Sequence, residues 1–312
     1  MPILTPTRSQ SPASSFCFGT MQFGGNADHA ASHAMYETCR AAGINFFDTA
    51  HVYTDGWSET FLGEFVAAER DHVLIATKVG FVGGCDRNNL MQQFVVSQKR
   101  LNMDYVDILY LHRFDPNCSL QETIETIVQL QNDGKVRQIG VSNYSAWQVM
   151  KAQRIAEQLG SRIDIIQPMY NLVKRQVEVE ILPMCASEGI AVVPYSPLGG
   201  GLLTGKYLSG ETGRLIQDDG YKLRYGVEWM HKTAEAIRDL SAEYGVSAAT
   251  LAVAWVAYNS TVSAPIISAR NVVQLKPSLD AIHYHLPPEL YARLSRLSPT
   301  PAPATDRLEE IQ

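Results

Sequence analysis

The sequence lacks a run of about 18 uncharged apolar residues, so no membrane-spanning helix is expected. Residues 1–15 are rich in proline and serine and lack the continuous apolar core of a secretory signal. The five cysteines are an odd number without a Cys-x-x-Cys pair, which disfavours a disulfide framework and a zinc site. These absences predict a cytoplasmic protein that has no membrane partner.

An excess of positive charge is also missing. The chain has 26 Lys and Arg against 32 Asp and Glu, which gives a formal net charge of −6. Such a balance offers no general attraction to nucleic acid, so an anionic ligand must be held by local basic groups. With 46% hydrophobic and 19% charged residues, the composition is that of a globular protein with a large core. Nothing in it indicates an oligomeric state.

A Gly-x-Gly-x-x-Gly turn is absent after the first predicted strand, which disfavours a doubly wound nucleotide-binding sheet. Segments with helical spacing separate short apolar runs whose first seven starts are 27–33 residues apart, the length of one βα unit. This alternation predicts an α/β fold, a (β/α)8 TIM barrel. The eight predicted strands are residues 16–21, 44–48, 73–78, 106–112, 136–142, 163–168, 190–194 and 265–268.

Three additions to the barrel are expected. Two helices, 228–244 and 247–258, precede the eighth strand, so one of them is extra, and a C-terminal helix follows Leu286. The glycine-rich segment 199–225 predicts a mobile loop that could cover a ligand. No linker divides the chain, so residues 1–312 are predicted to form a single domain with loose ends at 1–15 and 299–312.

Three neighbouring predicted strands end on ionisable side chains, Asp48, Lys78 and His112, and Tyr53 lies five residues beyond Asp48. Active sites of such barrels lie at the C-terminal ends of the strands. A nearby ammonium favours the phenolate, so Lys78 should make Tyr53 a stronger acid while Asp48 holds the lysine. His112 would donate to a substrate oxygen or help to pass the proton.

Other interpretations of these residues remain. Each alone could be structural: a loop cap, a snorkelling lysine, a core histidine or a packed tyrosine. A metal-dependent barrel hydrolase could use Asp48, His51 and His112 as ligands. However, no His-x-His pair ends the first strand and Lys78 would compete for the carboxylate, so no metal is expected.

Taken together, Asp48, Tyr53, Lys78 and His112 resemble the catalytic tetrad of the aldo-keto reductases. The similarity extends from Phe-Gly-Thr-Met at 18–21 to the predicted helix containing Gln274 and includes Gly-Val-Ser-Asn at 140–143 and Gln-Pro-Met-Tyr-Asn at 167–171. It implies reversible reduction of an aldehyde or ketone by a nicotinamide dinucleotide, with Tyr53 as proton donor. The potassium-channel β-subunits belong to the same superfamily, so a cofactor-binding regulatory protein with little turnover is the alternative.

The resemblance also implies a cofactor site. It places Ser142, Asn143 and Gln167 at the carboxamide and Tyr195 against the nicotinamide ring. Arg270 favours NADP(H) over NAD(H), because a guanidinium suits a 2′-phosphate. Ser268 and Ser278 depart from the usual glycine and asparagine. The implied cofactor residues are Gly19, Thr20, Met21, Ser142, Asn143, Gln167, Tyr195, Ser196, Pro197, Leu198, Gly200, Leu202, Gly205, Lys206, Ile267, Ser268, Ala269, Arg270, Gln274 and Ser278.

The substrate is expected to be a small carbonyl compound. The candidate pocket residues lie in or near predicted loops at the active end: Phe23, Trp57, Arg113, Tyr144 and Arg224. Trp57 could instead pack on its own helix, and Arg113 could pair with Asp115. The aromatic residues would suit a flat carbonyl compound, and the arginines a sugar or an acid.

Overall fold

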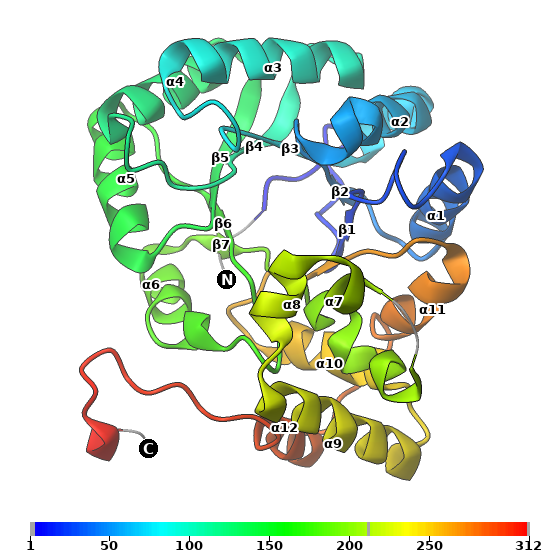
Figure 1. Ribbon diagram of the computed structural model, residues 1–312. Helices are drawn as coiled ribbons and strands as arrows, with labels where there is room; N and C mark the ends of the chain where they lie inside the picture. Colours follow the sequence, from blue (N-terminus) through cyan, green and yellow to red (C-terminus); the bar gives the residue numbers. More distant parts are fainter. Residues whose placement is uncertain (1–3, 211–212, 311–312) are drawn as a thin grey trace.

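A computed structural model of the protein describes residues 4–210 and 213–310, and it contains eight parallel strands surrounded by helices (Figure 1). The strands follow one another around the sheet in chain order, and β1 pairs with both β2 and β8. They are β1 (Cys17–Gly19), β2 (Phe46–Asp48), β3 (Leu74–Val79), β4 (Val106–Leu111), β5 (Val136–Ser142), β6 (Ile165–Gln167), β7 (Ala191–Val192) and β8 (Ile266–Ile267).

Hydrogen bonds close the ring between the last two strands. The N–H groups of Ser263 and Ile266 donate to the carbonyls of Val192 and Pro194, each at 2.8 Å. Every observed strand lies within or overlaps its predicted range. The (β/α)8 barrel predicted from the sequence is therefore confirmed.

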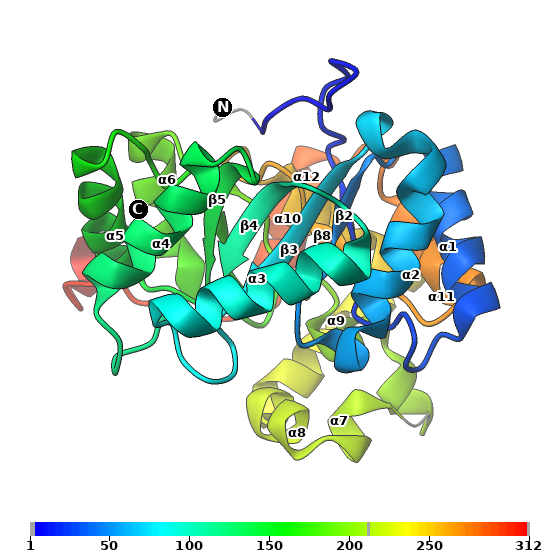
Figure 2. The same cartoon turned by 90° about the horizontal axis from the view of Figure 1, so that it is seen from above.

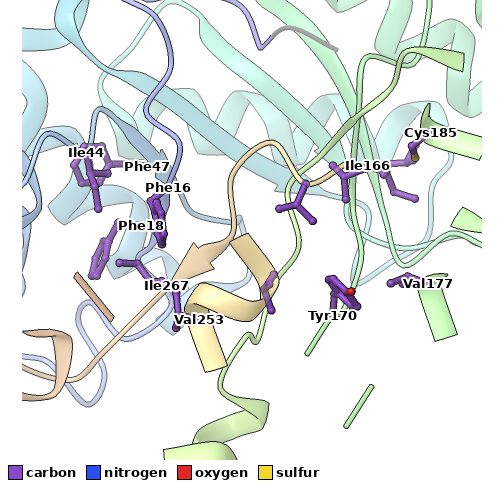
Figure 3. Packing of buried hydrophobic residues seen from close by; sticks show 14 of the residues in the cluster. Phe16, Phe18, Ile44, Phe47, Ile166, Tyr170, Val177, Cys185, Val253 and Ile267 are labelled. Atoms are coloured by element: carbon purple, nitrogen blue, oxygen red, sulfur yellow. The ribbon is translucent and has the colours of Figure 1, made fainter. Parts of the chain in front are cut away.

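Two apolar layers hold the barrel together, because strands buried on both faces point alternate residues inward and outward. Phe46, Leu74 and Ile108 belong to the cluster inside the ring, whereas their successors Phe47, Ile75 and Leu109 belong to the larger cluster under the helices. Figure 3 shows outward-facing residues such as Phe18 and Ile267 near Val253 of the covering helix α10 (Ala248–Tyr258).

The helices form an outer ring, seen from a second side in Figure 2. Helices α9 and α10 both precede β8, as predicted, and α10 is buried over most of its length. The longer helices are α1 (His29–Ala41), α2 (Trp57–Val66), α3 (Arg87–Leu101), α4 (Leu120–Asn132), α5 (Ala146–Gln158), α6 (Ile181–Glu188), α9 (Glu228–Tyr244), α10 (Ala248–Tyr258), α11 (Val272–Asp280) and α12 (Pro288–Ser295).

Within residues 4–210 and 213–310, no single helix is long and apolar enough to cross a membrane. In this described part of the chain, α9 and α10 pass the test only when taken as a pair, and they are bent by 101° relative to each other.

The N-terminal segment is not loose over residues 4–15. Leu4 is buried among the inward-facing side chains of the barrel. The N–H of Thr5 donates to Gln138 Oε1 at 3.0 Å, and Asn45 Oδ1 accepts from the N–H of Ser14 at 2.7 Å. The prediction of a loose segment was wrong here, because one buried apolar side chain and a few hydrogen bonds are enough to anchor a proline-rich segment. Residues 1–3 lie outside the described part.

The glycine-rich segment 199–225 was expected to be a loop, but most of its described residues are helical. It contains η4 (Gly199–Thr204), η5 (Lys206–Ser209), α7 (Arg214–Gln217) and α8 (Asp219–Tyr225). Leu215 and Tyr225 are buried, so apolar side chains between the glycines pack this segment onto the barrel. Figure 2 shows α7 and α8 at the end of the barrel opposite the N-terminal segment. The shorter 3₁₀ helices elsewhere are η1 (Tyr53–Gly56), η2 (Ala67–His72), η3 (Gln176–Glu178) and η6 (Leu308–Glu310).

The C-terminal residues 299–310 follow α12 as an extended, mostly exposed segment that ends in η6 (Figure 1). Residues 311–312 lie outside the described part.

Candidate active site

The ionisable residues at the ends of β2, β3 and β4 point into one end of the barrel. Asp48, Lys78 and His112 have the same strand parity as the inward-facing Phe46, Leu74 and Tyr110, each at the C-terminal end of its strand or just after it. Their alternation with outward residues brings them to the centre, as the sequence led us to expect.

Lys78 connects the group. Its ammonium donates to Asp48 Oδ1, to the carbonyl of Thr49 at 2.7 Å and to the phenol oxygen of Tyr53 at 3.2 Å. The structure therefore brings together Asp48, Lys78 and Tyr53 in one hydrogen-bonded chain. Tyr53 enters it from η1, the turn that follows β2.

Asp48 and Lys78 form a buried ion pair, with side chains 3% and 0% exposed. The second carboxylate oxygen of Asp48 accepts from Gln167 Nε2 at 2.9 Å. Burial lowers the pKa of Lys78, but its interactions and hydrogen bonds with Asp48 and Tyr53 outweigh that effect and leave the pKa raised. Lys78 is therefore a fixed cation, which is a stable arrangement only while its carboxylate partner remains.

Tyr53 differs from the sequence-based expectation in the direction of its pKa. Burial raises the pKa of the phenol, and the Lys78 ammonium opposes that shift without reversing it. The expectation considered only the ammonium, whereas desolvation of the phenolate is the larger effect. Tyr53 is therefore protonated at neutral pH, which is the form that can give up a proton.

His112 lies edge-on to Tyr53, with ring centroids 5.9 Å apart, and its own ring contacts Phe81. Burial, followed by the positive charges of Lys78 and Arg113, lowers the pKa of its imidazole to about 3. A neutral imidazole carries one N–H, so His112 can donate one hydrogen bond to a ligand oxygen beside Tyr53.

A cleft of about 1100 Å³ opens beside this group. Asp48, Tyr53 and His112 line it, whereas Lys78 does not. It also contains most of the predicted cofactor residues: Gly19, Met21, Ser142, Asn143, Gln167, Tyr195, Ser196, Pro197, Leu198, Gly200, Gly205, Lys206, Ile267, Ser268, Ala269, Arg270 and Gln274. Thr20, Leu202 and Ser278 do not line it, because their side chains are buried in the fold. Thr20 Oγ1, for example, donates to the carbonyl of Asp48 at 3.0 Å.

Hydrogen bonds fix the polar wall of the cleft near His112. Asn143 Nδ2 donates to the carbonyl of His112 at 2.9 Å, and Asn143 Oδ1 accepts from the Tyr195 hydroxyl at 2.7 Å. Ser142 Oγ donates to the carbonyl of Gln167 at 2.8 Å. These hydrogen bonds therefore hold the three side chains in fixed orientations at the wall of the cleft.

The other end of the cleft suits phosphate groups. Gly200 and Gly201 have φ values of +67° and +92°, and a Cβ at Gly200 would lie 2.7 Å from Tyr221. Arg238 and Arg270 supply positive charge to the lining. Ser268 Oγ is buried and has no hydrogen-bond partner among the described residues. A dinucleotide with its phosphates at this end fits the donor set.

Only two of the five predicted substrate residues, Arg113 and Arg224, line the cleft. Phe23 is fully buried against Phe18 and was wrongly placed in the pocket. Tyr144 is likewise buried, against Phe114. Apolar contacts on the outer side of the barrel draw both rings away from the cleft, although they stand in βα loops.

Trp57 also lies outside the cleft, 55% exposed and packed against Phe61 of its own helix. No salt bridge joins Arg113 to Asp115 in the described chain; the Arg113 guanidinium instead lies 5.0 Å from the centroid of the Phe81 ring.

Val52, Phe81 and Arg238 are among the lining residues that sequence reasoning missed. Phe81 stands two residues after the end of β3, so the strand-end rule that found Lys78 could have found it. Arg238 lies on α9 and had no such signal, because only the packing of that helix brings it to the cleft.

Across the described ranges, no three His, Cys, Asp or Glu side chains come together as a metal site. The Asp48 carboxylate, which a metal site would need, is already engaged by Lys78 and Gln167.

Comparison with known proteins agrees with this fold. A sequence model of the aldo/keto reductase family matches residues 15–299. The chain is 32% identical over 289 residues to a probable voltage-gated potassium channel subunit beta of Arabidopsis thaliana, covering 86% of this chain and 87% of that protein. It is 32% identical to the uncharacterized oxidoreductase YrpG of Bacillus subtilis, with 94% of both chains covered. It is also 33% identical to an aryl-alcohol dehydrogenase [NADP(+)] of Phanerodontia chrysosporium, over 85% of this chain and 75% of that protein.

The family match and the oxidoreductase names of several relatives make this barrel protein an oxidoreductase. The chain belongs to the aldo/keto reductase family.

Proposed function

We propose that the protein reduces an aldehyde or ketone to an alcohol with NADPH, in a reversible reaction. The observation that carries this proposal is the chain Asp48–Lys78–Tyr53 beside the neutral imidazole of His112 at the edge of the cleft. Bound NADPH would supply a hydride to the carbonyl carbon. Tyr53 would give its proton to the carbonyl oxygen, and His112 would donate a hydrogen bond to the same oxygen.

The roles of the remaining residues follow from their contacts. Lys78 stabilises the phenolate that Tyr53 leaves behind, and Asp48 keeps the lysine charged and in place. Ser142, Asn143, Gln167 and Tyr195 would hold the carboxamide and ring of the nucleotide. The five free thiols fit a reducing compartment, so we place the protein in the cytoplasm.

The substrate end of the cleft combines rings with positive charge. The guanidinium of Arg113 lies against Phe81, and that of Arg224 lies 5.1 Å from the centroid of the Tyr221 ring. Neither guanidinium has a carboxylate partner in the described part of the chain. An aromatic carbonyl compound that carries an acidic group suits this lining.

The test is NADPH consumption with a panel of aldehydes and ketones that includes benzaldehydes with and without a carboxylate. Turnover with product alcohol supports the proposal. Stable NADPH binding with slow turnover on every carbonyl would instead support a regulatory protein of the same fold.

The pH dependence should reflect the two perturbed pKa values. His112, with its pKa lowered to about 3, stays neutral from about pH 5 upward. Tyr53, with its pKa raised, is protonated at neutral pH and loses its proton only at alkaline pH. We expect kcat for reduction to fall only at alkaline pH, and alcohol oxidation to increase there. A change in kcat centred near pH ~6.5 that disappears in His112→Gln would show that this histidine titrates there, and it would contradict the neutral state.

Cofactor preference should depend on Arg270. Its guanidinium is proposed to bind the 2′-phosphate, so Arg270→Met should weaken NADPH binding about 10–100-fold, as expected for a lost charge-assisted hydrogen bond. NADH binding to the same variant is the control and should change little. Fluorescence titration with both nucleotides measures this, and an equal loss for the two would place Arg270 away from the 2′-phosphate.

A further inference from the structure

The turn that carries Tyr53 has an unfavourable backbone conformation. Thr54 and Asp55 have φ values of +47° and +52°, and Gly56 has +96°. Residues other than glycine occupy the left-handed region only when their surroundings hold them there. The contacts around residues 51–56 therefore decide where the phenol lies.

Arg100 of α3 holds this turn on both sides of Tyr53. One guanidinium nitrogen donates to the carbonyl of His51 at 2.8 Å, and the other donates to the carbonyl of Asp55 at 3.5 Å. A Cβ at Gly56 would lie 2.3 Å from Arg100 Cζ, so the guanidinium packs directly against the bare glycine. A single cationic group thus holds the backbone two residues before and two residues after the phenol.

Glu59 of α2 connects that guanidinium to the strand that carries Lys78. Its side chain is 0% exposed, and its Oε2 accepts from Arg100 at 3.3 Å. Its Oε1 accepts from Thr77 Oγ1 at 2.6 Å, and Thr77 directly precedes Lys78. A buried carboxylate paired in this way is costly to disturb, so it fixes the relative position of its partners.

We propose that Glu59 and Arg100 are positioning residues that set the separation between the Tyr53 phenol and the Lys78 ammonium. The inference rests on the proposed function, since it assigns to Tyr53 the role of proton donor. Thr77, Glu59 and Arg100 form a continuous bridge from β3 to the turn on η1. A neutral contact also holds the turn, in which Thr54 Oγ1 donates to the carbonyl of Phe23 at 2.7 Å.

Arg100→Met removes the cation of the bridge, Glu59→Gln removes the negative charge that holds it, and neither residue lines the cleft. We expect kcat to fall about 10–100-fold in both, because a displacement of about 1 Å at a reacting group has an effect of that size. KM for the carbonyl and the affinity for NADPH should change little.

The double variant should lose no more kcat than the worse single variant, because both substitutions act through one contact. Arg100→Lys should retain more activity than Arg100→Met, since it keeps the charge opposite Glu59.

Arg40→Met is the matched control. It breaks the bidentate ion pair between Arg40 and Glu69 on the outside of the barrel, which touches neither the turn nor the cleft. This variant should lose thermal stability but keep the kcat of the wild type. All assays are run well below the unfolding midpoint of each variant.

A crystal structure of Arg100→Met gives a readout that does not depend on activity. The separation of Tyr53 OH from Lys78 Nζ, 3.2 Å in the wild type, should increase. An unchanged separation, or a kcat equal to that of Arg40→Met, would overturn the inference. If the wild type itself reduces no carbonyl, the proposed function fails, and the crystallographic separation still tests the bridge.

Discussion

Tyr53→Phe is expected to lower kcat for carbonyl reduction by about 10²–10⁴-fold, the usual contribution of a positioned general acid. The substitution removes one oxygen and keeps the ring that packs edge-on against His112. Lys78 keeps its bonds to Asp48 and to the carbonyl of Thr49, so the charge at the centre of the site is preserved. The loss should therefore come from proton transfer and not from a collapse of the site.

Two measurements accompany this substitution. NADPH affinity, followed by fluorescence titration, should stay close to that of the wild type, because the phenol is assigned to the carbonyl. Tyr144→Phe is the matched control, since that ring is buried outside the cleft and should keep full turnover. Wild-type turnover in Tyr53→Phe would show that another group, with His112 the first candidate, delivers the proton.

The sequence was sufficient to predict the barrel and the group at its centre, for a physical reason. Buried parallel strands must be apolar on both faces, so Asp48, Lys78 and His112 stand out at the ends of such runs. Successive strands of a barrel are neighbours, and their C-terminal ends share one rim. Residues at the ends of successive strands are therefore expected to lie close together, whatever the conformation of the loops.

Features that depend on long-range packing were not predictable in this way. Phe23 and Tyr144 stand in βα loops like true pocket residues, and only the apolar neighbours on the outer side of the barrel remove them from the cleft. Arg238 reaches the cleft from α9, and no local pattern marks it. The direction in which the pKa of Tyr53 shifts could not be predicted, because it depends on how deeply the phenol is buried.

The bridge through Glu59 was also hidden. Glu59 lies in a helix whose sequence is that of an ordinary amphipathic segment. Its carboxylate is nevertheless fully buried and paired with Arg100, which lies 41 residues further along the chain. A charged residue inside a helix becomes informative only when its burial and its partner are known.

The buried ion pair at the centre of the site gives the second large effect. Asp48→Asn removes the negative charge but keeps the size of the side chain, so it leaves the fully buried ammonium of Lys78 without a counter-ion. Breaking such a pair costs about 3–5 kcal/mol of folding free energy. The pKa of Lys78 should also fall, since burial would then act on it with less opposition. Both changes weaken its support of the Tyr53 phenolate, and kcat should fall with them.

The double variant Asp48→Asn, Lys78→Met separates the contribution of the pair to stability from its contribution to catalysis. Replacing both charges removes the unpaired ammonium, so part of the lost unfolding free energy, measured by urea denaturation, should return. Activity should not return, because the phenolate then has no cation beside it. Recovery of turnover together with stability would mean that the pair serves only the fold. Failure to recover stability would mean that Gln167, whose amide donates to Asp48, cannot adapt to the uncharged pair.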